Sequence, residues 1–182
     1  MDLKNFNLQN YNSRLLDRTS DEDVNLLQGL CEQCNDFFQI CNGKNASKDE
    51  GKEYLDFLPP NKGFNDKFEI GIFDSNRLVA FVAIVRNFNQ NGKYALGILL
   101  LLPEYRGKGL GKEIVRNVEN WVLSENGREI RVVVQGQNTK ALKFWKKNGF
   151  EVYDEREAKD VIGGFEYLLI KRLCDENNNT NR

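Results

Sequence analysis

The stretch from Leu96 to Lys112 limits the fold more than any other part of the sequence. Its apolar run, Leu96–Leu102, has the length of a buried β-strand and ends at Pro103, which cannot donate to a strand ladder. A glycine-rich turn follows and leads into a helical pattern. Backbone N–H groups at a helix N-terminus lack partners and lie at the positive end of the helix dipole. This order of strand, glycine turn and helix therefore predicts a site for a phosphate group.

Two other phosphate-binding motifs do not fit this turn. A Walker A loop has four residues between its first Gly and the Gly-Lys pair, and a Ser or Thr follows. Here three residues separate Gly107 from Gly111, and Glu113 follows Lys112. A dinucleotide-binding fingerprint has the spacing G-x-G-x-x-G, whereas this turn reads G-x-G-x-G. The turn is therefore neither of these motifs.

The segment Leu-Leu-Pro-Glu-Tyr-Arg-Gly-Lys-Gly-Leu-Gly resembles the acetyl-CoA-binding signature of the GNAT acetyltransferases, whose core pattern is Arg/Gln-x-x-Gly-x-Gly/Ala. Arg106, Gly109 and Gly111 occupy the three places of that pattern. A second run downstream resembles the family's second signature, at its usual distance: Asn138, Ala141–Trp145 and Gly149–Phe150. Because two motifs match in order, with a strand between them, the resemblance is specific.

Periodicity and turn residues predict the remaining elements. Strands are expected at 11–18, 67–73, 77–86, 96–102, 130–134, 150–153 and 165–173, and helices at 21–40, 47–57, 110–125 and 138–148. The strand–helix–strand unit between 96 and 134 favours parallel pairing through a right-handed crossover. The prediction is an α/β (α+β) fold with a mixed, mostly antiparallel sheet of about six to seven strands and helices on both faces. The resemblance implies the GNAT-like acyl-CoA N-acyltransferase fold.

The expected organisation is one domain over residues 11–174, with a loose lead-in at 1–10 and a disordered polar tail at 175–182. No apolar run approaches the roughly 18–20 residues that span a bilayer. The N-terminus lacks the basic-then-apolar order of a secretory signal. We therefore expect a cytoplasmic protein that does not partner with membranes.

The sequence contains no histidine, which excludes Ser–His and Cys–His catalysis and histidine-ligated haem. The common zinc hydrolase sites are excluded for the same reason, and no metal site is expected. Its four cysteines are Cys31, Cys34, Cys41 and Cys174. Cys31 and Cys34 form a single C-x-x-C, which we interpret as small apolar residues on an amphipathic helix in preference to a redox pair.

Positive charge is concentrated around the two motifs. Residues 106–147 hold 10 Lys+Arg against 4 Asp+Glu, while the whole chain has a formal charge of −1. A basic patch suits either nucleic acid or a phosphorylated cofactor. A sequence pI near 5.7 argues against nucleic acid. The pyrophosphate and 3′-phosphate of coenzyme A fit this local charge.

The resemblance implies acetyl-CoA as the acyl donor and coenzyme A as the cofactor product. The implied cofactor-binding residues are Leu99, Leu100, Leu101, Arg106, Gly107, Lys108, Gly109, Leu110, Gly111, Lys112, Asn138 and Trp145. In the family the strand before the turn splays from the next one, and one of its N–H groups polarises the thioester carbonyl. That places Leu101 in a catalytic role through its backbone.

Trp145 and Glu69 are two further catalytic candidates, and the sequence supports them less strongly. The family often has a tyrosine where Trp145 stands, to protonate the leaving thiolate, and an indole is not an acid at neutral pH. Water, Tyr105 or Tyr153 are the alternatives, and packing is the other interpretation of Trp145. Glu69, on an early strand, is the candidate base that takes the proton of the amine, although a strand carboxylate is more often solvated.

The region between the first two strands lines the acceptor site in the family. Here this region is aromatic and acidic: Phe37, Phe38, Tyr54, Phe57, Phe64, Asp49, Glu50, Glu53 and Asp56. One interpretation is that these side chains form a wall that attracts a cationic amine. The other is that the aromatic side chains fill the core and the acidic ones are solvated. The predicted function is an acetyl-CoA-dependent N-acetyltransferase that transfers acetyl directly to a small-molecule or peptide amine in a ternary complex. The alternatives are a non-catalytic acyl-CoA sensor and an interaction domain with a vestigial site. Exposed strand edges are compatible with a homodimer.

Overall fold

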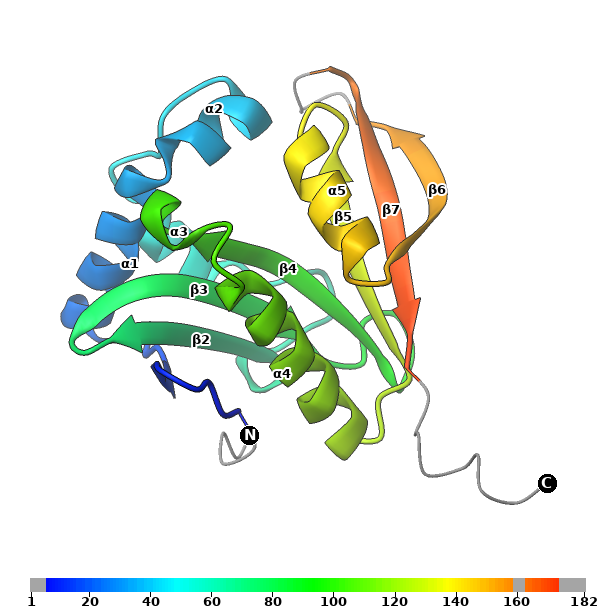
Figure 1. Ribbon diagram of the computed structural model, residues 1–182, viewed down its shortest axis with the longest axis horizontal. Coiled ribbons are helices and arrows are strands. Elements are labelled where there is room, and N and C mark those ends of the chain that lie inside the picture. Colours follow the sequence, from blue (N-terminus) through cyan, green and yellow to red (C-terminus); the bar gives the residue numbers. More distant parts are fainter. Residues whose placement is uncertain (1–5, 159–162, 174–182) are drawn as a thin grey trace.

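The computed structural model describes residues 6–158 and 163–173, and this part of the chain is built on one seven-stranded sheet (Figure 1). The strands are β1 Asn12–Leu15, β2 Lys67–Asp74, β3 Arg77–Val85, β4 Lys93–Leu101, β5 Glu129–Gln135, β6 Glu151–Glu157 and β7 Phe165–Arg172. The α-helices are α1 Asp21–Gln33, α2 Asn35–Asn42, α3 Glu50–Asp56, α4 Leu110–Ser124 and α5 Thr139–Lys147. Every predicted strand is present, with ends shifted by a few residues.

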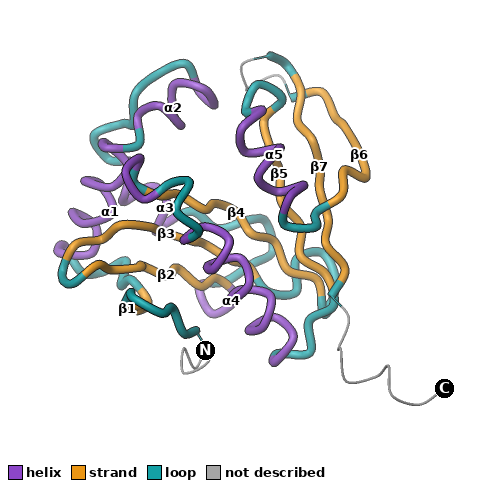
Figure 2. The backbone as a smooth tube through the Cα atoms, viewed as in Figure 1, coloured by secondary structure: helices purple, strands orange, loops and turns teal. Residues whose placement is uncertain are grey.

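The strand order across the sheet is β1-β2-β3-β4-β5-β7-β6, which Figure 2 traces along the backbone. Neighbouring strands are antiparallel except β4 and β5, which are parallel. The helix α4 forms the crossover between those two strands, as the sequence predicted. The fold class is therefore confirmed: the sheet is mixed and mostly antiparallel.

Helices cover both faces of the sheet. Trp121 of α4 is almost fully buried and packs edge-on against Phe68 of β2, with ring centroids 4.9 Å apart. Tyr54 of α3 packs against Phe81 of β3, which pairs with Gly71. Because Gly71 lies three residues from Phe68 and side chains alternate along a strand, the two rings point to opposite faces. Figure 1 accordingly shows α4 and α5 in front of the sheet and α3 behind it.

The predicted helix 21–40 is wrong in one respect, because it is two helices that meet at Cys34. The backbone there has φ −104° and ψ 27°, outside the helical range, and its N–H donates to the carbonyl of Cys31, three residues back. The Cys34 thiol is buried and donates to the Leu101 carbonyl, 3.3 Å away at the end of β4. A tertiary contact at this position therefore accompanies the break between α1 and α2.

The described part of the N-terminal segment packs on the domain. Phe6 and Leu8 are buried, and the Asn7 N–H donates to the Asn117 side chain of α4 at 2.8 Å. The predicted polar tail, 175–182, lies outside the described residues, so the domain limits stay a prediction. Among the described helices, none combines the length and the apolar character that crossing a membrane requires.

Asp23 fixes the start of α1 and gives a prediction about pH. Its carboxylate is buried and accepts hydrogen bonds from the Arg14 guanidinium, one of them 2.8 Å long, and from the Asp17 N–H at 2.7 Å. The bond from Arg14 lowers the pKa of Asp23 in spite of burial. We expect Asp23→Asn to reduce the free energy of unfolding at pH 7 by about 1–2 kcal/mol, discounted because Arg14 is partly exposed.

The pH dependence distinguishes this mechanism from a general packing defect. A depressed pKa contributes stability above the unfolded value, near 4 for aspartate, and loses it as pH falls through the folded value. The unfolding free energies of the wild type and Asp23→Asn in urea should therefore begin to converge as pH falls below about 4, and should meet below the folded pKa. Asp21→Asn, an exposed change in the same helical turn, is the control and should stay near the wild type at every pH. A difference that persists at low pH would contradict the assignment.

Candidate active site

A gap opens between β4 and β5, and it forms the centre of the candidate site. The two strands pair only where Lys93–Ala95 meets Glu129–Arg131, and β5 continues beside β7 instead. Figure 1 shows the remainder of β4 and β5 diverging from that point. One side of β4 is therefore left without a neighbouring strand from Leu96 onward, within the described chain.

Backbone groups of two leucines face this gap. The Leu102 N–H donates to the Val79 carbonyl, at the end of β3, at 3.0 Å. Successive N–H groups of a strand point to opposite sides, so those of Leu99 and Leu101 point toward the gap. Leu100 lies between them and has its backbone groups directed at β3, where it pairs with Phe81. Of the three predicted leucines, two thus present N–H donors to the gap.

The glycine turn follows β4 and ends at the N-terminus of α4. Gly107 and Gly109 have φ of +74° and +94°, a region that residues with a side chain rarely adopt. A Cβ built on either glycine would meet no atom within 4 Å, so the turn lines open space. The first N–H groups of α4, beginning at Leu110, have no intrahelical acceptor. These donors and this space fit an anion such as a pyrophosphate.

Gly111 has a different role from the other two glycines. A Cβ there would lie 3.2 Å from the Phe144 ring of α5. Its lack of a side chain therefore lets α4 and α5 approach each other, and this brings the second motif alongside the first.

Arg106 is held by protein groups on the α2 side of the turn. Its Nε donates to the Leu101 carbonyl at 2.8 Å, and its two terminal nitrogens bind the Asp36 carboxylate of α2. Lys108 and Lys112 are exposed, so they are the cations of the turn that remain accessible to a ligand. Sequence spacing gave no sign of the contact with Asp36, which lies 70 residues away.

The second motif supplies structure around the far side of the gap. The Asn138 side chain is buried and caps α5 by accepting from the Ala141 N–H at 3.0 Å. Its Nδ2 lies 4.0 Å from the Cys41 sulfur of α2. Trp145 is buried between Phe144 and Phe150, with ring centroids 5.1 and 5.0 Å away. The packing interpretation accounts for this indole without a proton-transfer role.

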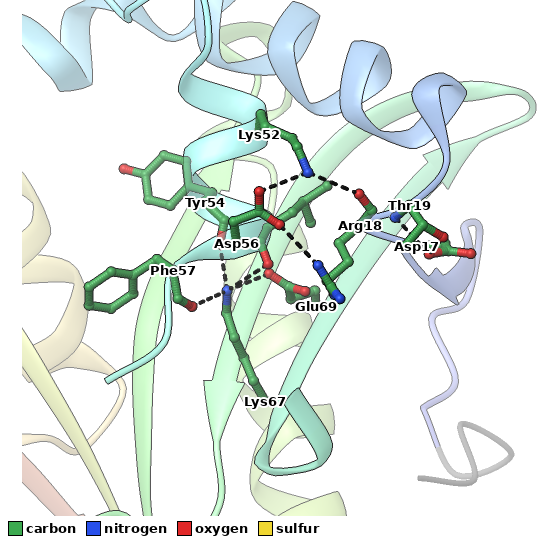
Figure 3. A network of polar contacts seen from close by, with 10 residues as sticks. Asp17, Arg18, Thr19, Lys52, Tyr54, Asp56, Phe57, Lys67 and Glu69 are labelled. Carbon is green, nitrogen blue, oxygen red and sulfur yellow. Dashed lines mark hydrogen bonds and ion pairs between the residues drawn. The ribbon is translucent and has the colours of Figure 1, made fainter. Parts of the chain in front are cut away.

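Glu69 lies on β2, where its side chain meets that of Lys67 (Figure 3). Its side chain is 9% exposed, and Oε1 is 2.6 Å from the Lys67 ammonium. Burial raises the pKa of Glu69, and the contact with Lys67 opposes that shift. Glu69 pairs with Ala83, and Ala83 pairs with Ile98 of β4, so two strand spacings, or about 10 Å, separate it from β4.

The aromatic residues of the predicted acceptor wall divide into two groups. Phe38 is buried, and Phe37 and Tyr54 pack against the core. Phe57 and Phe64 are exposed, with Phe57 at 62%. The first group fits the core interpretation, and the second remains accessible on the surface.

The cysteines of α1 and α2 are free, buried thiols. Burial raises the pKa of Cys34 to about 11, and burial also raises that of Cys41 to about 11. Burial also raises the pKa of Cys31, the other member of the C-x-x-C, so neither cysteine of that motif is ionised at neutral pH, as the apolar interpretation requires. The sequence did not reveal that Cys34 and Cys41 join α2 to both sides of the gap. No group of side chains that could hold a metal occurs in the described chain.

Comparisons with known proteins agree with this geometry. Spermidine N(1)-acetyltransferase of Thermoplasma acidophilum is 33% identical over 93 residues, which are 51% of this chain and 55% of that protein. The match thus spans about half the length of that relative. A GNAT-family protein of Desulfovibrio desulfuricans has the same fold, with a TM-score of 0.72, 14% identity, and coverage of 90% of this chain and 99% of that one.

The structure of the PaiA N-acetyltransferase from Thermoplasma acidophilum, in complex with coenzyme A, gives a TM-score of 0.64 at 22% identity. It covers 89% of this chain and 98% of that one. The sequence pattern of the Acetyltransferase (GNAT) family matches residues 31–150, a range that contains β4, the glycine turn, α4 and the Asn138 motif. This chain belongs to the GNAT acetyltransferase family.

Proposed function

We propose that this protein is an N-acetyltransferase that uses acetyl-CoA and transfers the acetyl group directly to an amine. The observation that carries the proposal is the gap beside β4, where the Leu99 and Leu101 N–H groups lack a neighbouring strand and the glycine turn lies at the strand's end. Acetyl-CoA supplies an acetyl group activated as a thioester. The coenzyme A in the PaiA complex supports this choice of donor.

The residues of the turn fit the phosphate end of coenzyme A. The N–H groups from Gly107 to Lys112 would bind the pyrophosphate, and the open space at Gly107 and Gly109 allows close approach of the backbone. Lys108 and Lys112 would add positive charge. Arg106 acts mainly by holding α2 against the turn, since Asp36 and the Leu101 carbonyl occupy its donors.

The chemical contribution of the chain is electrostatic. The Leu101 N–H would donate to the acyl carbonyl oxygen, which gains negative charge during transfer. Direct transfer is supported by the state of Cys34 and Cys41, because protonated, buried thiols are poor nucleophiles. Glu69 stays a predicted base. At about 10 Å from β4 it would have to take the proton through water.

Binding and turnover test the proposal together. Calorimetry should detect the binding of coenzyme A. The release of free thiol from acetyl-CoA should depend on an added amine, and spermidine is one of the amines tested because a relative is named for it. Intersecting double-reciprocal plots are expected for a ternary complex, whereas parallel plots would indicate an acyl-enzyme. Failure to bind coenzyme A would contradict the proposal. Tight binding without turnover on any amine would favour the acyl-CoA sensor.

A further inference from the structure

A small cavity lies on the α3 face of the sheet, at the end of β2 that is far from the glycine turn. Its volume is about 280 Å³, and it is lined by Leu15, Leu16, Asp17, Arg18, Phe64, Lys67 and Glu69. None of these residues belongs to β4, to β5 or to the glycine turn. The cavity therefore lies apart from the gap beside β4, although Glu69, which lines it, is also the predicted base.

The Glu69 carboxylate forms a buried acidic wall of this cavity. Lys67 occupies only Oε1, and the same ammonium also donates to the Tyr54 and Phe57 carbonyls at the end of α3 (Figure 3). The other oxygen, Oε2, accepts no hydrogen bond from any described residue. The Glu69 side chain as a whole is nine-tenths buried, and a buried carboxylate with an oxygen that lacks a donor is costly. The cavity thus offers a place for a positively charged donor.

Arg18 contributes a basic group to the same cavity. Its guanidinium carbon lies over the Phe64 ring, 3.9 Å from the ring centre. It makes one long contact, 3.4 Å, with Asp56, and its Nε and Nη2 donate to no other described residue. A stacked guanidinium with free N–H groups is suited to a carboxylate.

We propose that this cavity binds a small zwitterion, an α-amino acid whose ammonium contacts Glu69 and whose carboxylate contacts Arg18. Two acids and two bases line the cavity, so a neutral ligand with one charge of each sign matches it better than a polyamine. Leu15, Leu16 and Phe64 provide apolar surface for the side chain of the ligand. This inference does not rest on acetyl transfer, because the nitrogen held at Glu69 lies two strands from Leu101.

Calorimetry on the full chain without acetyl-CoA tests the idea with three matched probes. L-Leucine carries both charges, isopentylamine lacks the carboxylate, and 4-methylpentanoate lacks the ammonium. We expect leucine to bind at least about tenfold more tightly than either single-charge analogue, since each loses one charged contact. Equal affinity for leucine and isopentylamine, or no binding of leucine at tens of millimolar, would overturn the proposal.

Substitutions test which residue contacts each charged group of the ligand. Arg18→Gln should weaken the binding of leucine about tenfold or more and leave the affinity for isopentylamine unchanged. Glu69→Gln should weaken the binding of both. Arg77→Gln removes an exposed arginine that pairs with Glu104 elsewhere on the surface, and it should change neither affinity. Arg18 is partly exposed, so its variant keeps the test valid even if Glu69→Gln does not fold. Leucine binding that is insensitive to Arg18→Gln would place the ligand elsewhere and refute the assignment.

Discussion

Coenzyme A should bind the Gly109→Glu variant about 100-fold or more weakly than the wild type, as two lost charge-assisted hydrogen bonds imply. Gly109 is the N-cap of α4, with φ +94° and open space where a Cβ would stand. A glutamate there places a carboxylate in the proposed pyrophosphate site and strains the backbone by roughly 1–2 kcal/mol. Calorimetry with coenzyme A measures the loss, and circular dichroism verifies that the variant is folded.

Gly29→Glu is the matched control for this variant. Gly29 lies within α1, and a Cβ there also meets no atom within 4 Å. The control introduces the same charge on a helical glycine remote from the turn, so its affinity for coenzyme A should equal that of the wild type. If both variants bind as the wild type does, the glycine turn is not the phosphate site and the proposed function loses its main support.

Lys67→Met should reduce the free energy of unfolding by about 3–5 kcal/mol, the cost of leaving one member of a buried ion pair alone. The Lys67 side chain is 4% exposed, and it joins Glu69 to the carbonyls of Tyr54 and Phe57 at the end of α3 (Figure 3). The variant thus removes a counter-ion and a helix C-terminal donor together. Urea unfolding at pH 7 measures the effect.

The remaining carboxylate predicts how this loss varies with pH. The folded pKa of Glu69 is already raised by burial, and removal of Lys67 raises it further. A raised pKa favours the fold below the unfolded value, near 4.3, and that advantage disappears as pH rises through the folded value. The defect of Lys67→Met should therefore be smaller at pH 4 than at pH 7.

Two further variants isolate the buried charge. Lys67→Met combined with Glu69→Met removes both charges and should recover most of the stability lost in the single variant. Lys52→Met removes an exposed lysine, 2.7 Å from Asp56, and should cost no more than about 1 kcal/mol. A loss for Lys67→Met as small as that for Lys52→Met would show that the pair is not effectively buried.

Local patterns were enough to predict the sheet and the turn. The apolar run before Pro103, the glycines after it and the helical pattern that begins at Asn138 depend on neighbours in sequence, and each forms the predicted element. The strand–helix–strand order then predicted the parallel pair β4–β5, and the family resemblance implied the GNAT-like fold. Contacts between distant residues were beyond the sequence, because spacing carries no information about them. The break at Cys34 and the pairing of Arg106 with Asp36 are of this kind.

The Lys67–Glu69 pair is an intermediate case. Residues two apart on a strand share a face, so the sequence could have suggested that these side chains meet. It could not show that α3 covers them, and a solvated carboxylate was the natural expectation for a charged strand residue. Burial beneath the last turn of α3 is what raises the pKa of Glu69 and makes its second oxygen a candidate ligand group.

The short parallel pairing between β4 and β5 affects how firmly the two parts of the sheet are held together. Three residue pairs join the first four strands of the sheet to the last three, and the strands separate beyond them. A molecule lodged in that opening touches the amino-terminal and carboxy-terminal portions of the chain at once. The free energy of binding such a molecule therefore also opposes the separation of these two portions. Binding would stabilise a junction that the sheet itself forms through only three residue pairs.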